Sequence, residues 1–183
     1  GSEWFFHKTV TIINTLKRTE GLMASHPSSD IQFFPEGGAL VRGLQSRVGI
    51  KVTNPGGWGE KAIGYIVRNN TDTITSFQTG PFGMGSFFYT PVSGSADKAL
   101  VRLGDSTYIQ SLPAVSENGY VLTVTNLNSN QLQVKVSSNI AGKNWVQVFI
   151  HNHNSAAGNE KLMLQNGTGY MILDKSSLGE GVS

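Results

Sequence analysis

The 183-residue chain contains no cysteine. Disulfides, thiolate nucleophiles and zinc sites built from cysteine are therefore excluded together. The absence of cysteine does not indicate the cellular compartment, because a chain without thiols can exist in an oxidising or a reducing environment.

Charge and long apolar runs are scarce as well. Charged residues make up 14% of the chain, the formal net charge is +2, and the longest basic run is Lys17-Arg18. Such a chain has no concentrated positive field to neutralise phosphates, so we expect no nucleic-acid partner. No apolar run approaches the roughly 18 to 20 residues of a membrane helix, and no signal peptide opens this fragment, so we expect no membrane insertion by it.

What the sequence does contain is alternation of apolar and polar residues, which is typical of half-buried β-strands. Turn-forming residues separate the alternating segments. The clearest inward-facing sets are Leu132, Val134 and Val136, then Val48, Ile50 and Val52, and then Val146, Val148 and Ile150. Ten or more short strands at this spacing predict an all-β protein of sandwich type.

We predict two tandem immunoglobulin-like β-sandwich domains, at residues 30–105 and 106–183, joined near Leu103 to Gln110. Residues 1–29 are expected to hold one extra strand, within "EWFFHKTVTIIN", followed by a polar linker. This piece would be the tail of an upstream domain or an added edge strand.

Four segments carry a family resemblance: "IQFFPEGGALVRGLQSRVGIKV", "AIGYIVRNNTDTITSFQT", "GMGSFFYTP" and "LPAVSENGYVLTV". In this order they resemble the macroglobulin-like region of large exported proteins of Bacteroidetes-type bacteria, which are relatives of the α2-macroglobulin architecture. The resemblance implies macroglobulin-like sandwich domains within a larger exported protein, at the periplasm or the cell surface. It also implies that the closing "SLGEGVS" leads into a further strand, so that the second sandwich lacks its last strand.

The family's thioester module carries a Cys-Gly-Glu-Gln motif, and this chain has no cysteine. Covalent protease trapping therefore cannot reside in this piece.

The Pro-Glu-Gly-Gly stretch at residues 35–38 is interpreted as punctuation between strands. Pro35 fixes φ and lacks an N–H, so it belongs at a sheet edge or a turn, and Gly37 and Gly38 permit a chain reversal. Glu36 has two alternative roles, which are to cap backbone donors or to face a neighbouring domain.

Two motifs that suggest chemistry have plainer explanations. "GPFGMG", Gly80 to Gly85, is glycine-rich but leads into a strand rather than a helix, so we expect a hairpin turn and no phosphate site. "HNHN" places His151 and His153 on one strand face, opposite Val148, with no third ligand nearby in sequence. We expect exposed histidines there, with a metal site as the weaker alternative.

No Gly-x-Ser-x-Gly elbow, carboxylate pair or EF-hand-like loop is evident in the sequence. We therefore predict a protein that is not an enzyme and that uses no cofactor.

Loop aromatics are the remaining sign of binding. Trp58 lies in "PGGWGE" and Phe82 in a second glycine-rich turn. A flat ring on a loop can stack on a sugar or fill a partner's pocket, although Trp58 could instead fold back over the end of its own sandwich.

Together these observations favour a non-catalytic structural module that acts as a spacer and as an interaction surface for other domains of its parent protein or for a protein partner. The alternative is a carbohydrate- or peptide-binding module that uses Trp58 and Phe82. A strand-swapped homodimer is a further possibility, in which Trp4 to Asn14 fills the open edge of a neighbouring molecule.

Overall fold

The computed structural model describes residues 29–142, 145–152 and 155–178. The strands are β1 Asp30–Pro35, β2 Leu40–Val41, β3 Ser46–Thr53, β4 Ile63–Arg68, β5 Asp72–Gln78, β6 Met84–Tyr89, β7 Asp97–Leu103, β8 Ser106–Ser111, β9 Val115–Ser116, β10 Tyr120–Asn126, β11 Gln131–Ser138, β12 Trp145–Asn152, β13 Ser155–Met163 and β14 Thr168–Asp174. The described residues hold no α-helix, only the short 3₁₀ helix η1, Lys175–Leu178, so the prediction of an all-β chain is confirmed. No helix of the described part has the length and apolar character needed to cross a membrane.

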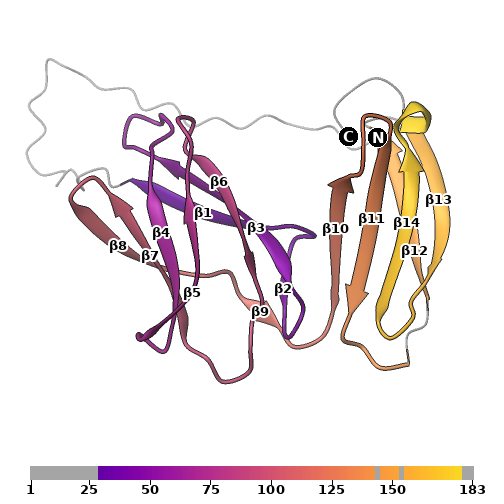
Figure 1. Cartoon of the computed structure of the whole chain (residues 1–183), viewed down its shortest axis with the longest axis horizontal. Helices are drawn as coiled ribbons and strands as arrows, with labels where there is room; N and C mark the ends of the chain where they lie inside the picture. The colour runs from indigo at the N-terminus through magenta and orange to yellow at the C-terminus, as the bar shows by residue number, and fades with distance from the viewer. Residues whose placement is uncertain (1–28, 143–144, 153–154, 179–183) are drawn as a thin grey trace, which may run out of the picture.

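The strands form two groups, which stand side by side in Figure 1. The first unit contains a three-stranded sheet, β1-β3-β6, and a four-stranded sheet, β5-β4-β7-β8, and all its pairings are antiparallel. Inward-facing residues of both sheets form one core, which includes Val48, Ile66 and Val101. The predicted alternation along β3 is confirmed, since Val48, Ile50 and Val52 are buried while Arg47 and Lys51 are exposed.

Aromatic rings fill the centre of this core. Phe77 stacks on Phe87 at 5.0 Å between ring centroids, and Phe33 meets both rings edge-on at 6.3 and 6.1 Å. Gly64 of β4 makes room for them, because a Cβ there would lie 2.0 Å from Cζ of Phe77.

The second unit contains the sheets β10-β11-β14 and β13-β12, again antiparallel. Its core is aliphatic and is centred on Val134, Val136, Val148, Leu162 and Leu164. The outward-facing residues of β12, such as Phe149, are exposed, as the alternation predicted.

The two units share one connectivity. In chain order, β10, β11, β12, β13 and β14 occupy the places that β1, β3, β4, β5 and β6 occupy in the first unit. The register shifts also correspond, since one falls between Ile66 and Val67 of β4 and the other between Ile150 and His151 of β12. Strands β7 and β8 have no counterpart among the described residues of the second unit.

Two segments differ from the sequence-based predictions, and a third lies outside the described residues. Residues 106–111, where we expected a linker and the start of the second domain, form β8 and pair with β7. The turn at Gly80 to Gly85 is tight, with the N–H of Gly83 donating to the carbonyl of Gly80 at 3.0 Å, but it is not a hairpin because β5 and β6 belong to different sheets. The extra strand expected at Trp4 to Asn14 lies outside the described residues.

Gly64 provides a direct test of the aromatic core. We expect Gly64→Ala to lower the free energy of unfolding by about 2 kcal/mol, because an added methyl overlaps a ring that is itself held in a stack. The matched control is Gly49→Ala on β3, where a Cβ would meet its nearest atom, the carbonyl oxygen of Phe34, at 3.5 Å. Denaturant unfolding of both variants checks the expectation, and equal stabilities would contradict it.

Candidate functional site

The Pro-Glu-Gly-Gly stretch lies where the two units meet. The carbonyl of Pro35 accepts a hydrogen bond from the N–H of Gly38 at 2.9 Å, which closes a four-residue turn. Gly37 has φ of +84°, the left-handed conformation that the third position of a type II turn requires. Pro35 ends β1, an edge strand, in agreement with its missing donor.

This turn is more than punctuation, because it faces the edge of β10. Oε1 of Glu36 accepts a hydrogen bond from the backbone N–H of Val124 at 2.9 Å. A Cβ on Gly37 would lie 3.0 Å from the backbone N of Leu122. Since β10 pairs with β11 on its other side, the turn covers the edge that β10 would otherwise leave unpaired. Of the two alternatives for Glu36, the structure shows both at once: it caps a backbone donor and it faces the other unit.

A second set of contacts surrounds this turn. Strand β9, in the connection between the units, pairs in parallel with β2. The side chain of Asn139, in the β11–β12 loop, donates through Nδ2 to the carbonyls of Arg42 at 3.0 Å and Glu117 at 2.7 Å. Its Oδ1 accepts from the N–H of Gly119 at 3.0 Å, so one amide joins the residue that follows β2, the connection and the second unit. Arg42 and Glu117 also form an ion pair, which is solvent-exposed.

Apolar burial completes the contact. Val41 and Val121 are each 1% exposed, yet neither belongs to the core of its own unit. Strand β10 contacts β2 and β3. We define the joint as Glu36, Gly37, Val41, Val121 and Asn139.

The predicted binding residue Trp58 lies on a loop with a fixed backbone. Oδ1 of Asn54 accepts hydrogen bonds from the N–H groups of Gly56 at 2.9 Å and Trp58 at 3.1 Å. The carbonyl of Trp58 accepts from the N–H of Asn54 at 2.8 Å. Although the backbone is held at both ends, the Trp58 side chain is 75% exposed, so it does not fold back over the sandwich.

Phe82 lies on the adjoining loop and is 76% exposed. The two loops touch through backbone, since a Cβ on Gly59 would lie 2.1 Å from the carbonyl of Phe82. The carbonyl of Gly83 accepts from the N–H of Val52 at 2.8 Å, which ties the Phe82 loop to the end of β3.

The structure therefore brings together two residues that are 24 positions apart in sequence (82 − 58), on interlocked loops at one end of the first unit. On the outer sheet faces, three exposed aromatic residues carry a cation over their rings: Arg47 on Phe88, Lys135 on Tyr170 and Lys161 on Trp145. In the described part of the chain no such cation covers Trp58 or Phe82. Both rings present open faces on which a planar ligand can stack.

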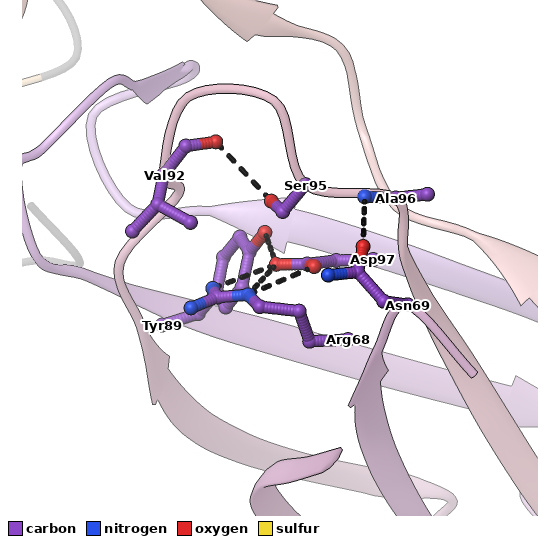
Figure 2. Close-up of polar contacts among 7 residues, drawn as sticks. All are labelled: Arg68, Asn69, Tyr89, Val92, Ser95, Ala96 and Asp97. Atoms are coloured by element: carbon purple, nitrogen blue, oxygen red, sulfur yellow. Dashed lines mark hydrogen bonds and ion pairs between the residues drawn. The ribbon is translucent and has the colours of Figure 1, made fainter. Parts of the chain in front are cut away.

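A polar cluster that sequence reasoning missed lies between the two sheets of the first unit (Figure 2). Arg68 donates to Asp97 through Nε at 3.1 Å and through Nη2 at 2.8 Å, in a two-point contact. The hydroxyl of Tyr89 donates to the same carboxylate at 2.7 Å. The Asp97 side chain is only 4% exposed.

The electrostatics of this cluster favour a fixed structural role. Burial by itself raises the pKa of Asp97, but the hydrogen bonds from Arg68, Tyr89 and Ser95 and the Arg68 charge outweigh it, so the pKa lies below its ordinary value. Burial, and then the hydrogen bond to Asp97, raise the pKa of Tyr89 well above its ordinary value. The hydrogen bond to Asp97 raises the pKa of Arg68. Each group is thus held in one protonation state at neutral pH, the opposite of what proton transfer requires.

The β4–β5 turn beside this cluster is also defined (Figure 2). The N–H of Thr71 donates to the carbonyl of Arg68 at 3.0 Å, and the two residues between them, Asn69 and Asn70, have positive φ of 51° and 65°, as a type I′ turn requires. Oδ1 of Asn69 accepts from the N–H of Ala96 at 3.1 Å, which joins this turn to the segment before β7.

His151 is exposed, as expected, and its ring stacks on that of Phe149 at 5.9 Å between centroids. His153 lies outside the described residues. Among the residues that the structure does describe, no three His, Cys, Asp or Glu side chains gather closely enough to hold a metal ion.

No family model matches the chain, and no curated protein matches its sequence.

The Arg68–Asp97 pair generates a prediction about pH. Because the pKa of Asp97 is lowered in the folded state, its charge stabilises the fold above the ordinary carboxyl range, and this contribution is lost as pH falls through the folded-state pKa. We expect Asp97→Asn to lower the free energy of unfolding by about 3 kcal/mol at pH 7, since it leaves the Arg68 charge partly buried without its partner.

The loss should begin to shrink as the pH falls below about 4, because the carboxyl of the unfolded state then takes up a proton, and it should keep shrinking until the pH has passed the lowered folded-state pKa. Denaturant unfolding of both proteins across this range measures the difference, in which the other carboxyl groups cancel. A difference that stays constant with pH contradicts the assignment.

Proposed function

We propose that this chain is a non-catalytic structural module: two tandem immunoglobulin-like, macroglobulin-like β-sandwiches that act as a spacer of fixed geometry and as an interaction surface in a larger exported protein. The joint is the observation that carries the proposal. Adjacent sandwiches connected by a free linker change their relative orientation readily. Here, backbone pairing, side-chain hydrogen bonds and buried apolar residues all hold the two units together at the joint.

Two properties of the joint support a spacer of fixed geometry. The hydrogen bonds of Glu36 and Asn139 each contribute about 1 kcal/mol. They act from different directions, Glu36 on the edge of β10 and Asn139 on the connection before it. A hinge would have to break both sets and also expose Val41 and Val121.

The shared connectivity of the two units and their two-layer cores support the immunoglobulin-like assignment. The resemblance of "FFPEGG" and "GMGSF" to macroglobulin-like regions supports a location at the periplasm or the cell surface. On this proposal the partners are other domains of the parent protein or a separate protein.

The test is the distance distribution between the units. Since the chain has no cysteine, Asp105→Cys and Ser129→Cys can carry two spin labels, one on an exposed turn of each unit. We expect a narrow distribution in the otherwise unchanged protein and a clearly broader one when Glu36→Ala and Asn139→Ala are combined, because the hydrogen bonds across the joint are then lost.

The matched control is Asn54→Ala, which also removes an asparagine that bonds two partners, but inside the first unit and away from the joint. Its distribution should stay narrow. A distribution that is already broad before the joint is altered contradicts the spacer.

A second function is favoured by one specific observation, the open rings of Trp58 and Phe82 on interlocked loops. This arrangement suits a carbohydrate- or peptide-binding platform, because apolar stacking requires exposed aromatic faces on a backbone that does not move.

For this platform we expect a saccharide or peptide from an array to bind the protein, and Trp58→Ala to weaken that binding about tenfold or more, as removal of an aromatic anchor does. Tyr170→Ala is the control, since Tyr170 lies in the second unit and its ring is covered by Lys135. Binding that is unaffected by Trp58→Ala, or equally reduced by Tyr170→Ala, would exclude the platform.

A further inference from the structure

A cleft of about 740 Å³ opens between the two sheets of the second unit. Leu122 and Val136 line it from one sheet, and Val146 and Val148 line it from the other. Tyr120 also lines it, as do Trp145, Gln147 and Phe149 from the outward-facing side of β12. The cleft therefore reaches from the incompletely filled core around the edge of β12.

The first unit shows what fills the same place there. Strand β12 corresponds to β4, and β4 is flanked by β5 on one side and by β7 on the other. Strand β7 directs Ala99, Val101 and Leu103 into the core, where they are buried. In the second unit β12 pairs with β13 only, and no described strand takes the place of β7.

Burial within the second unit agrees with this comparison. Alignment of the two register shifts makes Ile150 the counterpart of Ile66. Ile66 is 0% exposed, whereas Ile150 remains partly exposed, as do Val146 and Leu122. The residues are apolar, but the layer that would cover them is incomplete.

The edges of the second unit differ in access. Glu36 and Gly37 cover the edge of β10. The edge of β12 beside the cleft has no partner in the described part of the chain, and its outward-facing Phe149 is exposed. An uncovered strand edge next to an apolar cleft is the arrangement that binds an added strand.

We propose that the cleft and the free edge of β12 bind an extended peptide segment as an added antiparallel strand. The segment presents small aliphatic side chains at alternate positions, as β7 does with Ala99, Val101 and Leu103. In the register of β7 on β4, the first two of these positions lie opposite Ile150 and Val148, and the third lies beside Val146.

This binding mode rests on the cleft alone and not on the joint. If it fails, the spacer is unaffected, and if the spacer fails, an added strand can still bind to the second unit.

The probe is a synthetic peptide of residues 97–111, "DKALVRLGDSTYIQS", which contains β7 and β8. The protein carries Trp4→Phe and Trp58→Phe, so that Trp145, at the border of the cleft, is its only tryptophan. We expect a saturable change in Trp145 fluorescence and slower amide hydrogen exchange along β12, since its free backbone groups gain partners.

Two matched controls test whether the peptide binds as an added strand in the cleft. A peptide with Ala99→Ser, Val101→Ser and Leu103→Ser keeps length and charge but lacks the aliphatic face, and it should bind at least about tenfold more weakly, as expected for three lost aliphatic contacts. In the protein, Val146→Lys places a charge in the cleft wall and should abolish binding, whereas Ile172→Lys, an exposed position on β14, should not. If Val146→Lys prevents folding, as judged by circular dichroism, Val146→Thr replaces it with an expected several-fold loss.

Failure of the peptide to bind, or equal binding of the serine peptide, overturns the proposal. Analytical ultracentrifugation tests whether a second copy of the chain occupies the cleft instead. A dimer that forms with rising concentration, prevents peptide binding and slows hydrogen exchange along β12 would assign the cleft to that second copy. This result also overturns the proposal.

Discussion

The approach of the Pro35–Gly38 turn to the edge of β10 is the constraint on which the arrangement of the two units depends. It requires glycine at position 37 for two reasons: φ is positive there, and a Cβ would press on the backbone of Leu122. It requires an acceptor at position 36, where a carboxylate oxygen meets the N–H of Val124. The same contact fixes the orientation of the two units and covers the edge of β10, which would otherwise be open to pairing with another chain.

The two units that this contact joins differ in how fully they bury their cores. The first unit combines stacked phenylalanines with a buried Arg68–Asp97 pair, and its layers close around both. The second unit is aliphatic, and Val148, at the centre of its core, remains 9% exposed. Because burial of apolar area is the main stabilising term, we infer that the second unit contributes less to the stability of the whole.

Local pattern predicted the strands well, and contacts between distant residues account for what it missed. Alternation located β3, β11 and β12 because each has one buried face. It failed at β8, where Ile109 is exposed while its neighbour Tyr108 packs on the core. Gly158, a residue type that favours turns, pairs with Ile150 inside β13. The bond from Val124 to Glu36 spans 88 positions, so only the isolated acid in Pro-Glu-Gly-Gly hinted at it.

Two groups of exposed aromatic residues differ in what lies over their rings. Phe88, Tyr170 and Trp145, on the outer sheet faces, lie under cations, which bring hydrated charge next to the ring and oppose face-to-face association of sheets. Trp58 and Phe82, on loops, have no such cover in the described part of the chain and stay open to a ligand. On β12, Lys161 lies over the ring of Trp145, while the strand edge beside the cleft has no partner among the described residues. The same strand can therefore oppose nonspecific stacking at this ring and still accept a partner at its edge.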